Sequence, residues 1–347
     1  MTLFRATLRA LSIAAALTAP AAAQETDDAA SEDASGRPSF KIDLPVPCLA
    51  DETCIIQSYV DLDMTRRARD FQCRNRTSDG ADGTLFRLRD AKTMEAGANV
   101  VAVADGLVRG YRNGEPDGAY ASGVRDDTGE CGNGIIVDNA NGWETQYCHL
   151  KQGSVGVFRG RTIKAGEVIG KIGMSGATTV PALDFRVRYQ GNVIDPFSGR
   201  SVFEGCQGTG EGLWKPEALV YAGYQAAVLL NSGFAGGVPT PSGIEAGAYR
   251  DFTPSFDGAV LHFYVRTVGV EPGDVEELSI VGPDGRKLAT RSDTLATAEE
   301  GDRVRTVVLT RPDKGWTSGD YKGQYRLVRD GTELIAHVDT ATLGALQ

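Results

Sequence analysis

The sequence has 347 residues, of which 41% are hydrophobic and 24% charged, and its formal net charge is −10. This length suits about two domains, and the apolar content is enough to bury their cores, which excludes a chain that is disordered throughout. The negative charge excludes the basic surface on which nucleic-acid binding depends. The sequence contains three histidines, His149, His262 and His337. A metal or acid–base site that needs several histidines therefore has few candidates.

The N-terminus has the three parts of a secretory signal peptide. Arg5 and Arg9 supply positive charge, an apolar run follows as far as Ala22, and small residues up to Ala23 provide a cleavage site. The run is too short to span a membrane, and no second run of that kind follows. We therefore expect cleavage of a signal peptide at residues 1–23 and a periplasmic or secreted protein without a transmembrane segment.

Composition divides the rest of the chain into four segments. Residues 24–39 predict an acidic disordered linker, because they contain almost no large apolar side chain. Residues 40–213 contain short β runs separated by glycine, which predict a mostly antiparallel β domain. Residues 214–243 are expected to form a connector, partly helical, and the alternating runs of residues 244–347 predict an Ig-like β-sandwich. The expected fold class is therefore all-β.

The runs that predict strands can be placed individually. In the first domain they begin at Asn99, Gly134, Glu144, Glu167 and Leu183, and in the second at Ala259, Glu277, Arg303 and Gly323. His262 and His337 fall within the second pattern. No second ligand type is spaced sensibly around either residue, so we expect structural or surface histidines rather than a binding role.

Six cysteines, an even number in a chain expected to be exported, predict disulfide bonds. No two of them are spaced as Cys-x-x-Cys, which disfavours a thiolate zinc site. Sequence does not determine their connectivity, because six cysteines allow many pairings. The pairings that we expect are Cys131–Cys148, Cys54–Cys73 and Cys48–Cys206, the last of which would join the two ends of the first domain.

Five stretches of the first domain resemble, in their order and spacing, the lysostaphin-type or LytM-like zinc endopeptidases (peptidase family M23) that cut peptide cross-links in bacterial cell walls. They lie between about residues 79 and 196: Val101-Ala-Val-Ala-Asp105-Gly106-Leu-Val, Gly132-Asn-Gly-Ile-Ile-Val, Gly142-Trp-Glu-Thr-Gln-Tyr-Cys-His149-Leu150, Ile163-Lys-Ala-Gly-Glu-Val-Ile-Gly170, and Asp184-Phe-Arg-Val with Ile194-Asp195-Pro196 after it. The resemblance implies a LytM-like β domain of the duplicated hybrid motif kind.

A catalytic zinc keeps three protein ligands and an open position for water. The resemblance implies that the first two ligand positions are Ala81 and Leu85, that Asp184 is at the third, and that the two catalytic histidine positions are Ala182 and His149. Alanine and leucine cannot bind zinc. Only His149 keeps the family residue, so we expect a degenerate site with no metal and no cofactor, although zinc is the metal of the family.

One alternative keeps a metal. Asp79 and Asp82 could gather with Asp184 and His149 around a hard or borderline cation. Against this, carboxylates in a turn such as that of Asp79 and Asp82 are routinely solvated. Without a metal, His149 is either a retained residue that lines a groove or a residue that contacts a ligand.

The resemblance and the losses together predict a catalytically inactive LytM-like domain that binds peptidoglycan peptide or regulates a cell-wall hydrolase. A peptide strand could lie along exposed sheet edges, held by backbone hydrogen bonds. The first alternative is an active metalloendopeptidase that cleaves peptidoglycan cross-links with non-standard metal ligands. In a second alternative the sandwich carries the function and the first domain is a spacer.

Overall fold

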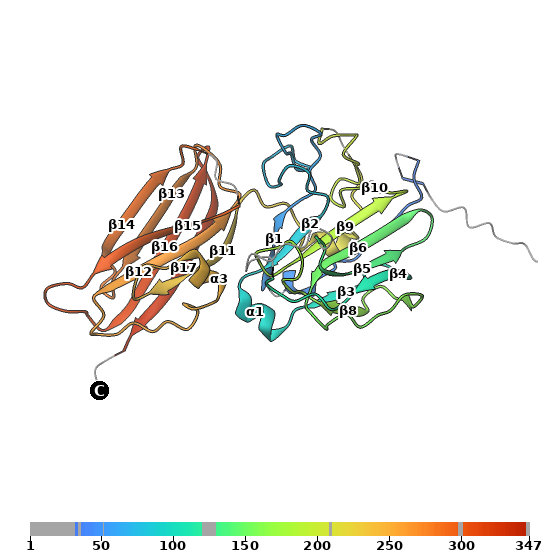
Figure 1. Ribbon diagram of the computed structural model, residues 1–347. Coiled ribbons are helices and arrows are strands. Elements are labelled where there is room, and N and C mark those ends of the chain that lie inside the picture. The colour runs from blue at the N-terminus through green and yellow to red at the C-terminus, as the bar shows by residue number, and fades with distance from the viewer. Residues whose placement is uncertain are drawn as a thin grey trace, which may run out of the picture. The chain divides into compact units, whose positions relative to one another are not determined.

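The computed structural model describes residues 32–33, 36–50, 52–119, 130–207, 210–297 and 301–344. The signal peptide expected at residues 1–23 lies outside these ranges. From Phe40 onward the chain forms one compact unit that contains two β regions (Figure 1). The expectation of an all-β, antiparallel fold is confirmed. A helix long and apolar enough to cross a membrane is not found in the described part of the chain.

The first β region is built on an eight-stranded antiparallel sheet with the order β1-β2-β9-β6-β5-β4-β7, and β10 pairs with β9. Its strands are β1 (Cys54–Ser58), β2 (Thr84–Leu88), β4 (Gly106–Arg112), β5 (Asn133–Asp138), β6 (Trp143–Leu150), β7 (Thr162–Ile163), β9 (Ala182–Tyr189) and β10 (Asn192–Val193). A separate two-stranded sheet contains β3 (Asn99–Val101) and β8 (Val168–Lys171). The short helices η1 (Pro47–Leu49) and α1 (Ala91–Ala96) accompany these sheets.

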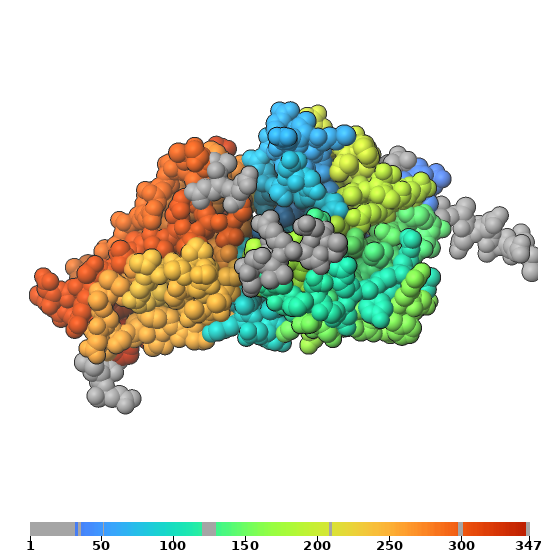
Figure 2. Space-filling model, in the orientation of Figure 1, coloured from blue at the N-terminus to red at the C-terminus, as the bar shows by residue number. Residues whose placement is uncertain are grey.

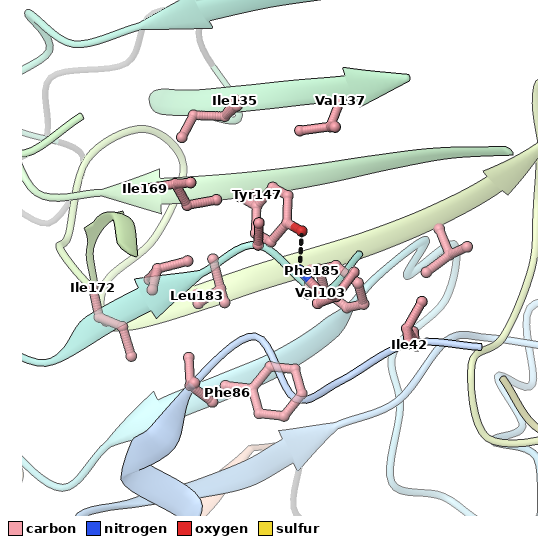
Figure 3. Packing of buried hydrophobic residues seen from close by; sticks show 14 of the residues in the cluster. Ile42, Phe86, Val103, Ile135, Val137, Tyr147, Ile169, Ile172, Leu183 and Phe185 are labelled. Carbon is pink, nitrogen blue, oxygen red and sulfur yellow. Dashed lines mark hydrogen bonds between the residues drawn. The ribbon is translucent and has the colours of Figure 1, made fainter. Parts of the chain in front are cut away.

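The core of the first region lies against one face of the eight-stranded sheet. Leu183, Phe185 and Val187 alternate along β9 and are completely buried. Side chains from neighbouring strands pack with them, and the backbone N–H of Val103 donates to the Tyr147 hydroxyl at 3.0 Å (Figure 3). Because side chains of a strand alternate between faces, the even-numbered residues of β9 are left for the opposite face.

The second β region is a sandwich of two antiparallel sheets (Figure 1). One sheet has the order β11-β12-β15 and the other β14-β13-β16-β17. The strands are β11 (Val228–Ala235), β12 (Val260–Val268), β13 (Val275–Val281), β14 (Lys287–Thr294), β15 (Asp302–Thr310), β16 (Gly319–Arg329) and β17 (Thr332–Leu343). The segment expected to be a connector contributes β11 as well as the helices α2 (Pro216–Leu219) and α3 (Pro241–Glu245). Pairing with β12 along its whole length makes β11 a strand of the sandwich.

The two histidines of the sandwich have different surroundings. His262 is 8% exposed, and burial lowers its pKa below the ordinary value. The His337 Nε2 atom lies 2.9 Å from the Ser232 hydroxyl and 3.3 Å from an Asp339 carboxylate oxygen. Both histidines therefore have contacts within the sandwich fold.

Three disulfide bonds join the six cysteines, and one of them is the expected Cys131–Cys148. The other two expected pairings are wrong. Cys48 is bonded to Cys54, because η1 and a hydrogen bond from Thr53 N–H to the Cys48 carbonyl turn the chain back at the start of β1. Cys73 is therefore left for Cys206, with a Cα–Cα distance of 5.2 Å.

A buried ion-pair network joins the two β regions. Arg87, in β2, has a completely buried side chain and donates to Glu245 of α3 and, at 2.9 Å, to Asp302 of β15. Arg266 of β12 donates to the same two carboxylates. Two guanidinium groups and two carboxylates therefore balance each other inside the unit. Lys92, in α1, pairs with Asp251 at 3.1 Å. Figure 2 shows the segment that contains α1 in contact with the start of the second β region.

Asp195, in the Ile194-Asp195-Pro196 stretch, gives the fold a testable dependence on pH. Burial raises its pKa to about 7, although Oδ2 accepts hydrogen bonds from the Ser198 N–H and hydroxyl. Because the folded-state pKa is raised, the favourable contribution of the protonated form is complete below about pH 4 and is lost as pH rises to about 7. In Asp195→Asn the melting temperature should therefore fall less than in the parent protein between these pH values.

Thermal unfolding at a series of pH values measures this difference. Asp313→Asn is the control, because that aspartate is exposed. Parallel pH profiles for the parent and Asp195→Asn would contradict the prediction.

Candidate functional site

The face of the eight-stranded sheet opposite the core is referred to below as the site face. On β9 it carries the even-numbered residues, which include Ala182, Asp184 and Arg186. The register places Asp184 between Leu85 of β2 and Cys148 of β6, in one row across three strands. His149 follows Cys148 directly. The structure therefore brings four of the predicted site positions together: Leu85, Ala182, Asp184 and His149.

Ala81 and the two aspartates near it lie in the loop that leads into β2. The Ala81 carbonyl accepts a hydrogen bond from the Asp61 N–H at 2.8 Å. Asp82 reaches the site face, whereas Asp79 is exposed. Within the described ranges, no three His, Cys, Asp or Glu side chains are arranged to hold a metal ion. The four-residue cation site considered from the sequence therefore does not form here.

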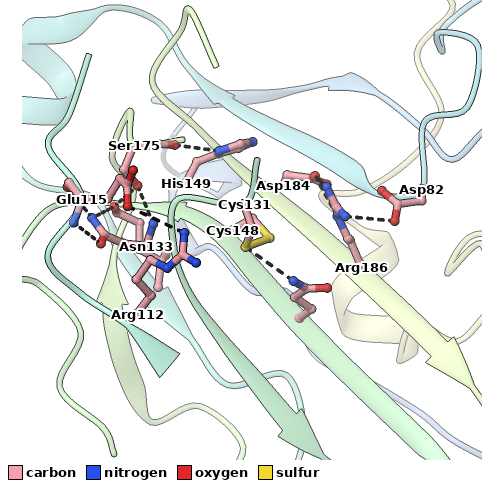
Figure 4. The surroundings of a disulfide bond; sticks show 12 residues. Asp82, Arg112, Glu115, Cys131, Asn133, Cys148, His149, Ser175, Asp184 and Arg186 are labelled. Atoms are coloured by element: carbon pink, nitrogen blue, oxygen red, sulfur yellow. Dashed lines mark hydrogen bonds and ion pairs between the residues drawn. A yellow bond between two sulfur atoms is a disulfide. The ribbon is translucent and has the colours of Figure 1, made fainter. Parts of the chain in front are cut away.

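Arg186 lies between Asp184 and Asp82 (Figure 4). It donates from Nε and Nη2 to Asp184 Oδ2, at 2.9 and 2.6 Å, and from Nη1 to Asp82 Oδ2 at 2.9 Å. Burial works against this charge, but the carboxylates of Asp184 and Asp82 raise the pKa of Arg186 above its ordinary value. The guanidinium is thus a fixed cation between two aspartates.

Arg188 extends the network along β9. It donates to Asp82 Oδ2 at 2.8 Å and to the side-chain carbonyl of Gln146 at 2.7 Å. Gln146 is on β6, two residues before Cys148, and its amide nitrogen lies 3.5 Å from the Cys131 sulfur. A polar surface of arginine, aspartate and glutamine side chains therefore runs beside the disulfide.

Gly83 allows the loop that carries Asp82 to lie close to β9. A Cβ atom at this position would lie 1.7 Å from Asp184 Oδ1 and 3.0 Å from Arg186 Cγ. Any larger residue would therefore displace Asp184 or the loop. The close packing of the ion-pair network therefore requires glycine at position 83.

His149 is held in one orientation. It is 6% exposed and has a φ of 65°, a region that residues other than glycine seldom adopt. Its Nδ1 lies 2.8 Å from the Ser175 carbonyl oxygen, which can only accept, so Nδ1 carries the proton. Burial lowers the pKa of His149, although Asp184 opposes the shift, and the ring is therefore neutral at neutral pH. A neutral ring with this tautomer has Nε2 as an acceptor.

These residues do not fit a zinc ion. Zinc in a catalytic site needs three protein ligands. Ala81, Leu85 and Ala182 offer no donor atom, and the carboxylate of Asp184 is already bonded to a guanidinium. A second cation beside Arg186 would be repelled. We therefore derive no chemical step that passes through a metal at this site.

Sequence reasoning missed Arg186, Arg188 and Gln146. The first two could have been found from the alternation along Asp184-Phe-Arg-Val-Arg, which puts both arginines on the face of Asp184. Gln146 precedes Cys148 by two residues and lies on the same face for the same reason. The contact between Arg186 and Asp82 could not have been found from alternation, because these residues are 104 positions apart in the sequence.

Comparison with known proteins agrees with this geometry. Residues 91–196 match the family model "Peptidase family M23". Residues 91–196 of the first β region therefore match a peptidase M23 domain, and the first β region is called the M23 domain below. The matched range includes His149, Ala182 and Asp184 but begins after Ala81 and Leu85.

Two relatives share parts of this region. The DD-carboxypeptidase/endopeptidase Mpg of Neisseria meningitidis serogroup B (strain ATCC 13091 / M2091) is 38% identical over 88 residues, which are 24% of this chain and 20% of Mpg. The cell division protein DipM of Caulobacter vibrioides is 39% identical over 64 residues, which are 18% of this chain and 10% of DipM. The chain therefore spans at most a fifth of the length of these relatives.

Two solved structures to which part of this chain is similar are matched over most of their own length. A chain of the SpoIIQ–SpoIIIAH pore-forming complex has 19% identity and a TM-score of 0.33, and the match covers 47% of this chain and 92% of that one. The catalytic domain of lysostaphin from Staphylococcus simulans has 21% identity and a TM-score of 0.28, with 43% and 91% covered.

Proposed function

We propose that this protein is an exported component of the bacterial cell envelope whose M23 domain does not hydrolyse peptides. In this proposal the domain binds peptidoglycan peptide or regulates a cell-wall hydrolase. One observation carries the proposal: the Arg186 guanidinium is bonded to Asp82 and to Asp184, the residue at the third ligand position that the family resemblance implies. An arginine in this place supplies charge and hydrogen bonds but no activated water.

The site face offers a peptide several groups for recognition. Along β6 and β9 lie Arg188, Gln146 and the neutral ring of His149. Arg186 is hydrogen-bonded to the carboxylates of both aspartates, Asp184 and Asp82. Groups of this kind bind the amides and carboxylates of a peptide without changing them. A role outside the cytoplasm is supported by the three disulfide bonds, since such bonds persist in oxidising compartments.

Metal content and cleavage test the proposal together. The purified protein should contain far less than one zinc ion per chain and should leave isolated peptidoglycan sacculi uncut, with or without added zinc. One zinc per chain, together with sacculus cleavage that a chelator abolishes, would instead support the alternative of an active metalloendopeptidase with non-standard ligands.

Sedimentation with sacculi tests the binding role. Gln146→Trp would place a large side chain on the site face and should weaken binding by about tenfold. The control is Lys164→Trp, because that side chain is 74% exposed and lies in a loop. Unchanged binding in Gln146→Trp would argue against the site face as the binding surface for peptidoglycan.

The same Gln146→Trp variant tests the regulatory role. Added to a purified cell-wall amidase or endopeptidase with sacculi as substrate, the parent protein should change the rate of cleavage and the variant should not. The proposal would be overturned if the parent protein neither bound sacculi nor changed the rate of the hydrolase. Point variants are preferable to removal of residues 215–347, because removal would take both carboxylate partners from the buried Arg87.

A further inference from the structure

A cavity lies where the two β regions meet, and none of the site-face residues described above line it. Its volume is about 690 Å³, and it is lined by β1, by residues 220–229 and by the start of β17. This size lies within the range of ligand-binding pockets, which often occur at the junction of domains. We call it the junction cleft.

Two edge strands line the junction cleft. β1 is the last strand of the eight-stranded sheet, and β17 is the last strand of the four-stranded sheet. Ile55 of β1 and Leu334 to Ala336 of β17 are among the lining residues. Backbone groups along an edge strand can pair with an extended peptide, which then adds a strand to the sheet.

Two guanidinium groups, of Arg76 and Arg89, and one carboxylate, of Glu52, line the junction cleft, so its charged lining is positive on balance. Arg76 is 3% exposed and donates to the carbonyl oxygens of Ile56, Gln57 and Gln225. Arg89 donates to the Glu52 carbonyl at 2.7 Å and to the Leu230 carbonyl at 2.6 Å. Among the described residues, neither guanidinium forms an ion pair with a carboxylate, whereas Arg87 and Arg266 each form two.

Burial makes this charge costly. It lowers the pKa of Arg76 and of Arg89, and the carboxylates of Asp70, Glu52 and Asp90 oppose the shift only at longer range. A partly buried guanidinium without a direct counter-ion favours an anionic ligand, because a carboxylate can accept two of its hydrogen bonds.

The rim of the junction cleft is apolar and exposed. Val220 is 75% exposed and Tyr221 is 51% exposed, and both line the cavity. Exposed apolar side chains beside a cavity are typical of a surface that contacts a ligand or a partner. Together, the edges, the two cations and the apolar rim match an extended chain with a negative group.

We propose that the junction cleft binds an extended peptide that carries a carboxylate, with the peptide backbone along β1 or β17 and the carboxylate at Arg89. This site is separate from the site face, so the proposal goes beyond the function proposed above. The carboxylate can be the C-terminus of the peptide or an acidic side chain, since both present the same group to a guanidinium.

Affinity selection from a synthetic pool of random octapeptides tests this proposal. The pool is made once with free C-terminal carboxylates and once as C-terminal amides, and the probe is the full chain with its disulfides intact. Selection should enrich peptides that carry a carboxylate. Enrichment from the free-acid pool alone assigns the C-terminus, and enrichment of acidic residues from both pools assigns a side chain. Enrichment of neutral amidated peptides, or of none, would overturn the proposal.

Variants then locate the binding of a selected peptide, labelled with fluorescein. Arg89→Gln should weaken it by about tenfold or more, and Arg286→Gln, at a side chain that is 80% exposed in a turn, should not. Val220→Glu should weaken binding and Val220→Lys should not, which keeps the test decisive if Arg89→Gln does not fold. Gln146→Trp, on the site face, should leave binding unchanged. Equal binding by the two Val220 variants, or loss in Gln146→Trp, would contradict the assignment to this cleft.

Discussion

Replacing Arg87 with methionine should lower the free energy of unfolding by about 2–4 kcal/mol. The substitution keeps much of the apolar stem but removes one of two cations that face Glu245 and Asp302. Loss of one partner from a buried ion pair leaves a charge without compensation, which is costly. We place the value below that of a fully buried pair, because the side chains of Glu245 and Asp302 are 18% and 21% exposed.

Urea unfolding of the oxidised protein measures this effect. The control is Arg109→Met, because Arg109 is 60% exposed and its single ion pair with Glu144 should contribute no more than about 1 kcal/mol. The double variant Arg87→Met with Glu245→Gln removes one charge of each sign from the network. It should regain part of the free energy of unfolding that Arg87→Met loses. Equal stability of Arg87→Met and the Arg109 control would show that the network does not hold the two β regions together.

Substitutions at the family positions should create a tighter zinc site in this domain when Arg186 is removed along with them. The variant needed combines Ala81→His, Leu85→Asp, Ala182→His, Asp184→His and Arg186→Ser. The four substitutions restore the donor atoms that the family resemblance implies, and the fifth removes a fixed cation that is bonded to the residue at the third ligand position, Asp184. Competition with a fluorescent zinc chelator measures the affinity.

The matched control for this experiment keeps the four substitutions but has Arg188→Ser in place of Arg186→Ser. Arg188 contacts Asp82 but not Asp184, so its removal should help less. We expect the variant without Arg186 to bind zinc at least about tenfold more tightly than the control, because the remaining guanidinium repels the metal. A folded five-residue variant that binds no zinc would show that the family positions are wrongly assigned to this sequence.

The fold of the M23 domain could largely be predicted from the sequence, because its information is local. Runs such as Leu183 to Tyr189 alternate between core and site face, and glycines separate them from the next strand. The same alternation places Arg186 and Arg188 on the site face, although neither is a position that the family resemblance implies.

Long-range contacts could not be predicted in this way. Arg87 occupies a position on the outer face of a strand, where an arginine normally meets solvent, and it is buried because α3 and β15 of the second region supply carboxylates. The pairing of Cys73 with Cys206 likewise depends on loops that come together only in the folded chain. β11 was not expected in the connector, because its pairing partner begins 25 residues after the strand ends, at Val260.

The bond between Cys73 and Cys206 also determines what happens when the backbone is cut. It joins two positions separated by 133 residues, and this interval contains most of the M23 domain, including the whole of β2, β6 and β9. A single cut by a protease anywhere in the interval leaves both fragments in one covalent molecule. If the protein is exported, as proposed above, and meets proteases there, a nicked chain can therefore keep the site face and the junction cleft in the same molecule.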